Sequence, residues 1–565
     1  MAVPLIETFN LESFQSPIQE ALADFRRSGL IARIWKKDST VWAEKDEEIS
    51  NRLGWLEAPE RMAGALPEIG RFVEEVRQAG YTHALLLGMG GSSLAPEVFG
   101  KVFGTAKGFL QLKVLDSTDP EAVLGFKNSL PLEKTLFIVS SKSGTTLETD
   151  SFLNFFYTMA ADAVGKARAS AQFAAITDPG TRLEKISRSL EFRRSFSGDP
   201  DIGGRFSVLS PFGLVPAALI GVDISLLLQQ GQKAARLCRN SSLPDNPGAS
   251  LGLLLGVLAQ AGKDKATFLI SPRMESFGAW VEQLLAESTG KDGRGILPIV
   301  KEHEFVPDKL GQDRVFVAIQ LAEDRTYEPV VGLLKQAGRP LVVMALDDLY
   351  ELGSQFFLWE MATAVAGHVL RINPFDQPNV AASKKKTEAL LNLYKERGRF
   401  ADGKPDFDGP DFALYSDAPA TSMEEGLGRF LRNARAGNYL VIQAFLPPKP
   451  EIDAAVQKLT AKLRSKTWLA VTSEFGPRFL HSTGQLHKGD AGNGLFIQLT
   501  AEDKIDVPVP DEPGSRSSSC SFSILKQAQA RGDREALRER GRRIIGIHFK
   551  TDVLDGLKKL NSLIN

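Results

Sequence analysis

Two short segments rich in glycine and hydroxyl side chains each follow an apolar run typical of a buried β-strand. Gly88-Met-Gly-Gly-Ser92 follows Ala84–Leu87, and Ser141-Lys-Ser-Gly-Thr-Thr146 follows Leu136–Val139. We expect a helix to begin directly after each segment, so that backbone N–H groups, hydroxyls and the positive end of a helix dipole surround a small space. One such segment is typical of a tight turn or a helix cap. Two of them, at the ends of neighbouring strands, indicate a phosphate site.

A second kind of chemistry is suggested by Gln283 and Glu287, four residues apart in a stretch that we expect to be helical from about Met274. Residues with this spacing share one helix face, and the glycine of Ser288-Thr-Gly-Lys291 marks the helix end. A lone glutamate on a helix more often lies on a solvated face. The apolar neighbours Leu284-Leu-Ala286 favour a functional position instead.

The elements that must position these residues alternate between apolar strands and helices, which predicts parallel sheets covered on both faces. We therefore predict an α/β fold with two doubly wound parallel-sheet domains, an N-terminal helical segment and a smaller C-terminal α/β domain. The expected units are residues 1–75 (helical), 76–245, 246–400 and 401–565. The strands expected in the two central units are Ala84–Leu87, Leu112–Leu115, Leu136–Val139, Phe173–Ile176, Thr267–Ile270, Ile296–Val300, Val315–Ile319 and Leu341–Met344.

The last unit begins after a polar linker rich in glycine, proline and aspartate, 401–410. Two helices are expected before it, at about 356–370 and from Ser383 to about Arg397. The strands expected within the unit are Tyr439–Ala444, Leu469–Thr472, Leu495–Leu499 and Ile544–Ile547, with helices at 451–464 and 523–541.

The composition excludes several classes of protein. Lys+Arg 68 against Asp+Glu 69 gives a net charge of −1, so no overall field attracts nucleic acid or an anionic membrane. Only Cys238 and Cys520 occur, which argues against a disulfide framework. We find no signal peptide and no apolar stretch of membrane-spanning length. We therefore expect a cytoplasmic protein that binds neither nucleic acid nor membrane.

Six motifs together resemble the glucose-6-phosphate isomerases among the sugar isomerase (SIS) domains. The resemblance is strongest to the isomerase half of bifunctional transaldolase/glucose-6-phosphate isomerase proteins. Besides the two phosphate-loop segments, the motifs are Gly203-Gly-Arg-Phe-Ser207, Glu287-Ser-Thr-Gly-Lys291, Asp376-Gln-Pro-Asn-Val-Ala-Ala-Ser-Lys384 and His481-Ser-Thr-Gly-Gln485.

This resemblance implies a role for each matching residue. Glu287 would be the base that moves a proton between C2 and C1 of the open sugar. Arg205 would supply a fixed cation for the enediolate oxygen; without its motif a surface salt bridge would be expected. Lys384 would help to open the pyranose ring, although it begins a run of three lysines and Lys385 is the alternative. The residues expected to hold the sugar or its phosphate are Gly91, Ser92, Ser141, Lys142, Ser143, Thr146, Gln283 and Gln377.

Ring opening also needs a proton shuttle at the ring oxygen, a role suited to histidine. The resemblance assigns it to His481, but in this chain the histidine motif follows the Glu287 and Asp-Gln-Pro motifs instead of lying between them. Either the C-terminal domain folds back to supply His481, or His481 is structural. The alternatives are His487, His303 and His368, of which His368 is expected in the core.

The resemblance implies reversible isomerisation of D-glucose 6-phosphate and D-fructose 6-phosphate, in glycolysis and gluconeogenesis, through ring opening and a cis-enediolate. Two alternatives remain: dual specificity that includes mannose 6-phosphate, and a non-catalytic sugar-phosphate sensor. We expect no cofactor and no metal, because metal-ligand spacings are missing and the first loop lacks the third glycine of a dinucleotide fingerprint. The family likeness suggests a homodimer, with His481 acting in cis or in trans.

Overall fold

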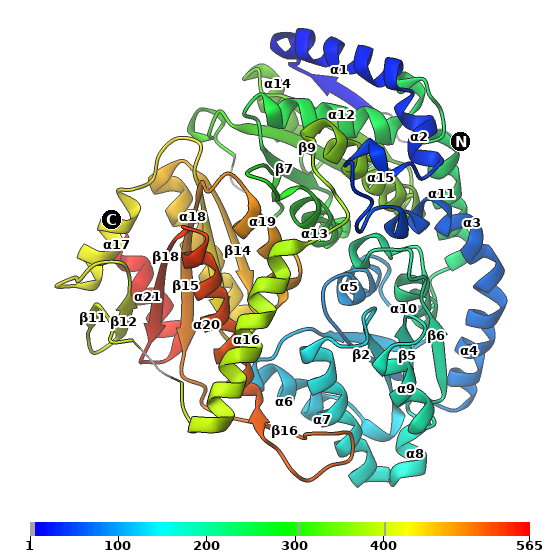
Figure 1. Ribbon diagram of the computed structural model, residues 1–565, viewed down its shortest axis with the longest axis vertical. Coiled ribbons are helices and arrows are strands. Elements are labelled where there is room, and N and C mark those ends of the chain that lie inside the picture. Colours follow the sequence, from blue (N-terminus) through cyan, green and yellow to red (C-terminus); the bar gives the residue numbers. More distant parts are fainter. Residues whose placement is uncertain (1–5, 303–304, 401–402, 565) are drawn as a thin grey trace.

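The computed structural model describes residues 6–302, 305–400 and 403–564. Three large sheets surround the centre of the molecule (Figure 1). The first sheet lies at the lower right of that view, the second at the top, and the C-terminal sheet at the left.

The first sheet is entirely parallel, with the strand order β3-β2-β4-β5-β6. Both of its faces are buried: Leu86 and Ile138 face one hydrophobic core, whereas Leu85 and Phe137 face another. This two-sided burial explains why the strand sequences are apolar runs and do not alternate with polar residues. The strands are β2 (His83–Gly88), β3 (Gln111–Leu115), β4 (Thr135–Ser140), β5 (Phe173–Thr177) and β6 (Arg194–Ser197). Its connecting helices include α5 (Gly91–Phe103), α6 (Pro120–Ser129), α7 (Leu147–Val164) and α9 (Arg182–Ser189).

The second sheet has the order β1-β10-β9-β7-β8. Four of its strands are parallel and were predicted: β7 (Lys265–Ile270), β8 (Leu297–Ile299), β9 (Arg314–Leu321) and β10 (Leu341–Leu346). The fifth, β1 (Ile6–Phe9), pairs antiparallel with β10 at the sheet edge. The expectation that residues 1–75 are purely helical is therefore wrong at this strand, which is too short to show a clear sequence period. Neighbouring helices are α12 (Pro247–Gln260), α13 (Phe277–Thr289), α14 (Glu328–Gln336) and α15 (Leu352–Leu370).

The remaining helices before the C-terminal unit belong mostly to the large core between the first two sheets. This core also contains the N-terminal segment, through residues such as Trp55 and Phe72. The helices are α1 (Gln15–Ser28), α2 (Leu30–Trp35), α3 (Ala58–Met62), α4 (Leu66–Gln78), α10 (Pro211–Leu219) and α11 (Ile224–Leu237).

The C-terminal sheet has the order β11-β12-β18-β15-β13-β14. Strands β18, β15, β13 and β14 are parallel to one another, whereas β12 pairs antiparallel with β18 and β11 pairs antiparallel with β12. Its strands are β11 (Phe407–Asp408), β12 (Phe412–Tyr415), β13 (Tyr439–Phe445), β14 (Ala470–Phe475), β15 (Gly494–Ala501) and β18 (Arg543–Phe549). A separate two-stranded ribbon is formed by β16 (Pro508–Val509) and β17 (Cys520–Ser521). The helices are α17 (Met423–Leu431), α18 (Pro450–Thr467), α19 (Gly484–Gly489), α20 (Phe522–Glu539) and α21 (Val553–Leu563).

These sheets confirm the predicted α/β class, with two parallel-sheet units and a C-terminal α/β unit. The exact domain boundaries stay predictions. Three helix starts differ from the expectation; one of them is α15, which begins at Leu352 instead of about residue 356. Helix α16 (Pro378–Arg397) begins five residues before Ser383, because Pro378 occupies its first position, where a missing N–H costs nothing. Helix α13 begins at Phe277, because Pro272–Met274 forms a separate 3₁₀ turn.

Candidate active site

The residues predicted to do chemistry gather where the parallel strands of the first sheet end. The segments after β2 and β4 both lie at the carboxyl edge of that sheet and lead directly into α5 and α7. In open α/β sheets this edge is where ligands bind. Helix α13, helix α16 and a turn of the C-terminal unit approach the same region (Figure 1).

The first loop needs its glycines because three other segments pack against it. Gly90 has φ +56, and a Cβ there would lie 2.9 Å from both Gln283 Nε2 and the His481 carbonyl oxygen. A Cβ on Gly91 would overlap the carbonyl oxygen of Gly204. Side chains at either position would therefore push apart the elements that form the site. Ser92 follows in the first turn of α5 and is buried.

The second loop presents hydroxyls at the N-terminus of α7. Ser141 Oγ and Thr146 Oγ1 are 3.0 Å apart; Ser141 is buried and Thr146 half-buried, while Ser143 is exposed. Gly144 turns the loop with φ +64, which brings it against Thr181. Neutral donors at a helix N-terminus suit a phosphate group.

Lys142 is the predicted phosphate residue whose side chain is used elsewhere. Its Nζ lies 2.6 Å from Asp178 Oδ2 and also donates to the carbonyl oxygen of Asp199. Its ammonium group is thus neutralised within the first unit. Only its backbone N–H remains on the loop that carries Ser141 and Thr146.

Arg205 is 2% exposed and uses its whole guanidinium group. Nε donates to Ser288 Oγ (2.7 Å) and Nη1 donates to Gln377 Oε1 (2.8 Å). Nη2 donates to the carbonyl oxygens of Pro374 (2.6 Å) and Asp376 (3.0 Å). Burial lowers the pKa of Arg205, but this side chain stays cationic at any physiological pH. The result is a rigid positive charge that joins the first unit to the loop preceding α16.

Glu287 forms an ion pair with Arg205. Its Oε1 lies 3.4 Å from Arg205 Nη1, and its Oε2 accepts a hydrogen bond from Gln283 Nε2 (3.0 Å). Both side chains are buried on one face of α13, as their spacing predicted. Gln283 Nε2 also donates to the carbonyl oxygen of His481 (2.8 Å), so α13 contacts the C-terminal unit directly.

The C-terminal unit does fold back onto the site. The 3₁₀ turn η12 (Arg478–His481), which follows β14, places His481 Nε2 2.8 Å from Glu148 Oε1, near the start of α7. Burial by itself raises the pKa of Glu148, but the facing His481 and the nearby Lys384 outweigh it, so that the pKa lies below its ordinary value. Glu148 is therefore an ionised acceptor, and His481 Nε2 is the donor of this hydrogen bond.

An arginine one turn earlier fastens η12 to the first unit. Arg478 forms ion pairs with Glu97 of α5 and with Asp116 after β3, the latter at 3.3 Å. The two carboxylates raise the pKa of Arg478 against the effect of burial. This contact holds His481 against the phosphate loops within a single chain.

The three consecutive lysines of α16, Lys384 to Lys386, lie in different surroundings. Lys384 is exposed and lies close enough to Glu148 to lower its pKa, which places Lys384 at the site. Lys386 pairs with Glu539 of α20 at 2.5 Å, and Lys385 is exposed. The choice of Lys384 over Lys385 stays a prediction, supported by the effect of the Lys384 charge on the pKa of Glu148.

The other histidines lie elsewhere. His487 is fully buried between two phenylalanine rings with neither ring nitrogen bonded, and burial lowers its pKa far below the usual value. His368 Nδ1 contacts the carbonyl oxygen of Val41 at 2.7 Å, a structural position. His303 lies outside the described residues.

Two site residues were missed by the sequence analysis. Nothing in the sequence marks Glu148 as a site residue, because acidic residues are common in the first turn of a helix, where they stabilise it. Lys291 ends the Glu287 motif and is 3% exposed, with Nζ 2.5 Å from the carbonyl oxygens of Asn373 and Asp376. Burial and the adjacent Arg205 lower the pKa of Lys291 to about 7.

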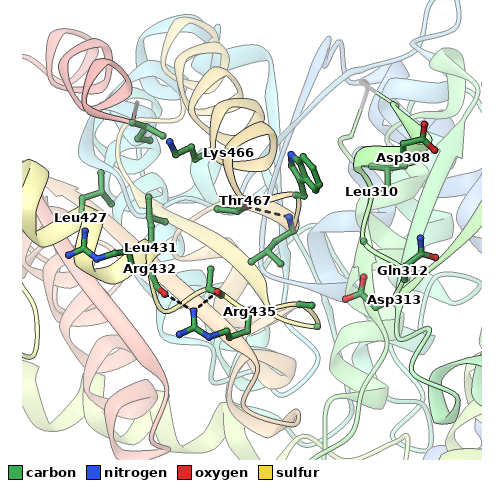
Figure 2. A pocket seen from close by; sticks show the side chains of 18 of the residues that line it. Asp308, Leu310, Gln312, Asp313, Leu427, Leu431, Arg432, Arg435, Lys466 and Thr467 are labelled. Carbon is green, nitrogen blue, oxygen red and sulfur yellow. Dashed lines mark hydrogen bonds between the residues drawn. The ribbon is translucent and has the colours of Figure 1, made fainter.

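A pocket between the second and the C-terminal units lies away from this chemistry (Figure 2). It has a volume of about 890 Å³ and separates Arg432, Arg435 and Lys466 of the C-terminal unit from Leu310 and Asp313 of the second. Its residues precede β9, β13 and β14, so it lies at the amino ends of strands, opposite the edge where the site residues converge. Its lining includes none of the residues predicted to do chemistry.

Comparisons with known proteins identify the family. A family model described as phosphoglucose isomerase matches residues 66–296. A probable glucose-6-phosphate isomerase of Haloarcula marismortui is 30% identical over 343 residues, covering 54% of this chain and 77% of that protein. The glucose-6-phosphate isomerase of Carboxydothermus hydrogenoformans is 28% identical over 417 residues, covering 63% of this chain and 88% of that protein. A crystal structure of a glucose-6-phosphate isomerase from Chlamydia trachomatis shares the fold with a TM-score of 0.57 at 19% identity, covering 67% of this chain and 86% of that one.

Fold, site and relatives define an α/β isomerase that acts on sugar phosphates. The chain belongs to the glucose-6-phosphate isomerase family.

Within residues 6–302, 305–400 and 403–564, no group of three or more His, Cys, Asp or Glu side chains has an arrangement suited to a metal ion. No helix in these ranges is long and apolar enough to span a membrane.

Proposed function

We propose that this protein interconverts D-glucose 6-phosphate and D-fructose 6-phosphate by ring opening followed by proton transfer through a cis-enediolate. The observation that carries the proposal is the meeting of Glu287, Arg205 and His481 beside two donor loops. A sensor would need the loops but not a carboxylate paired with a buried guanidinium.

The phosphate would lie at the N-termini of α5 and α7. Ser92, Ser141 and Thr146, with the backbone N–H of Gly91, offer neutral donors there. Such donors hold a dianion while keeping the nearby positive charge for the reacting end of the sugar. Gln377, fixed by Arg205, would contact the sugar.

Ring opening requires a proton on the ring oxygen as the C1–O5 bond breaks, and loss of the proton from the C1 hydroxyl. His481 Nε2–H donates a hydrogen bond to Glu148 and keeps its proton. The other ring nitrogen, Nδ1, is therefore the one that would exchange a proton with the substrate. Lys384 lies on the same side of the site and would assist at the C1 hydroxyl.

Proton transfer then moves a hydrogen from C2 to C1. Glu287 would accept it from one carbon and return it to the other, which leaves the carboxylate unchanged at the end, while the hydroxyl proton passes from O2 to O1. Negative charge develops on the enediolate oxygen. Because Glu287 makes the longest contact of Arg205, at 3.4 Å, it is the partner that a substrate oxygen would replace on Nη1.

The site we propose is complete within one chain, since His481 reaches it from the C-terminal unit of the same molecule. A homodimer stays a prediction, with no residue of the second copy needed. We also propose a cytoplasmic location, in glycolysis and gluconeogenesis, which the two free cysteines Cys238 and Cys520 support.

The test is a coupled assay of the purified full chain with fructose 6-phosphate and, separately, with mannose 6-phosphate. We expect turnover of fructose 6-phosphate to glucose 6-phosphate, with a loss of at least about 100-fold in kcat for Glu287→Gln. Glu328→Gln, on the exposed start of α14, is the matched control and should be unaffected. Turnover of mannose 6-phosphate would establish dual specificity. Tight binding of fructose 6-phosphate without turnover would overturn the proposal in favour of a sensor.

A further inference from the structure

A buried chain of hydrogen bonds runs from Thr118 through Gln529 of helix α20 to Glu148, the carboxylate that faces His481. Gln529 Nε2 donates to Glu148 Oε1 at 2.7 Å, and Thr118 Oγ1 donates to Gln529 Oε1 at 2.8 Å. Thr118, Gln529 and Glu148 are all at least 95% buried. None of the steps proposed above uses Thr118 or Gln529, yet Gln529 lies two hydrogen bonds from the histidine and Thr118 lies three.

The chain fixes which way the amide points. A glutamine side chain has one accepting and one donating end, and the two can be exchanged by a flip about the last torsion. The ionised Glu148 can only accept, so the NH₂ group of Gln529 must face it, and the Oε1 end of the amide then accepts from the hydroxyl of Thr118. Glu148 Oε1 therefore receives two donors, His481 Nε2 and Gln529 Nε2, on a single oxygen.

A second contact fixes the helix that carries Gln529. Lys526 lies one turn earlier on the same face of α20, and its Nζ is 2.6 Å from Oδ2 of Asp119, the neighbour of Thr118. Lys526 also pairs with Asp503 of its own unit. The segment after β3 thus holds α20 at two adjacent points, which sets the distance between Gln529 and Glu148.

We propose that Gln529 and Thr118 are positioning residues for ring opening, which hold the Glu148 carboxylate so that it orients His481. Neither residue touches the reacting atoms. This inference rests on the proposed function, because it assigns His481 to the ring-opening step and Glu287 to proton transfer. It predicts that the two residues affect the first step and leave the second unchanged.

The experiment compares a cyclic substrate with one that is permanently open. Fructose 6-phosphate must open before it reacts. 5-Deoxyfructose 6-phosphate lacks the hydroxyl needed for a furanose, and its O6 is phosphorylated, so it stays open and reports only Glu287 through deuterium exchange at C1. Gln529→Leu and Thr118→Val remove, respectively, the donor and the hydroxyl that orients it, with little change in volume.

For both variants we expect kcat on fructose 6-phosphate to fall about 10- to 100-fold, as for the loss of a buried hydrogen bond to a charged group. KM and the exchange rate of the open analogue should stay within about threefold. Thr118→Ser should restore the activity. Gln498→Leu is the matched control, because this equally buried glutamine donates to the carbonyl oxygen of Ala530 on the same helix without contacting Glu148.

Unchanged turnover by folded Gln529→Leu, or equal losses in both reactions, would overturn the inference, as would the same loss in Gln498→Leu. If Gln529→Leu does not fold, Thr118→Val tests the same inference. A normal exchange rate in Glu287→Gln would instead show that the proposed function itself is wrong.

Discussion

Replacing Arg205 by lysine keeps a positive charge at the centre of the site and removes its shape. The guanidinium makes four hydrogen bonds and one ion pair from three nitrogens that lie in one plane. A lysine ammonium offers three donors from a single point on an unforked stem. It cannot reach Ser288, Gln377 and both carbonyl oxygens of the loop before α16 together.

The size of the effect follows from these contacts. At least two of the four hydrogen bonds are lost, each worth about 1.5–3 kcal/mol for a charged donor, so the free energy of unfolding should fall by about 3–6 kcal/mol. Loss of a donor aimed at a developing oxyanion costs about 10²–10³ in kcat. Because Arg205 does not contact the phosphate loops through its side chain, KM should change little.

The assay is steady-state turnover of fructose 6-phosphate, together with urea unfolding of Arg205→Lys. Arg193→Lys is the matched control, since Arg193 donates to the carbonyl oxygen of Ala171 and pairs with Glu75 away from the site. It should lose stability and keep its kcat. A folded Arg205→Lys variant with kcat within about threefold of the wild type would refute the reasoning.

Three further changes test other parts of the molecule. Thr146→Val removes a hydroxyl beside Ser141, so KM for fructose 6-phosphate should rise about 10- to 100-fold with kcat nearly constant; a change confined to kcat in the same steady-state assay would contradict the phosphate role. Arg478→Met leaves Asp116 without its buried cation, which should lower the free energy of unfolding by about 3–5 kcal/mol in urea and reduce kcat by releasing η12; an unaltered kcat would show that the arginine does not position the site. Burial raises the pKa of Glu360 well above 4.5, so the folded chain keeps a proton that the unfolded chain releases as the pH rises. Wild-type stability should therefore fall, relative to Glu360→Gln, by up to about 1.4 kcal/mol per pH unit above pH 4.5, and parallel urea curves at pH 5 and pH 8 would disprove this.

The sequence predicted the secondary structure correctly where burial alone determines it. Most strands of the two central sheets were predicted because fully buried parallel strands are continuous apolar runs between turns, as at Leu136–Val139. Strand β6 was missed because it is a short edge strand in which only Phe196 is buried. The face shared by Gln283 and Glu287 followed from helix geometry, and it brought both side chains to the same cation. Strand β1 was missed because four residues at a sheet edge carry no period.

Contacts between distant segments were beyond the reach of the sequence. Glu148 and His481 are 333 residues apart, and no local pattern shows that one unit docks on another with this registry. The direction of the Lys142 side chain was equally hidden, since its loop motif is compatible with either phosphate or Asp178 as the partner. The motif order of the chain raised the question of how His481 reaches the site, and only the packing of η12 answers it.

The placement of His481 and Gln529 in the last unit sets the order in which the active site can form during synthesis. When the ribosome has translated the first 400 residues, the phosphate loops, Arg205 and Glu287 can already be folded, but the surface that receives η12 is still bare. The remaining strands, through β18 (Arg543–Phe549), need about 150 more residues, or roughly 8–30 s at about 5–20 residues per second. During that interval Glu97 and Asp116 face water, and their charges keep the unfinished surface soluble until Arg478 arrives. If His481 acts in ring opening as proposed, the nascent chain cannot open the sugar ring until its final unit docks.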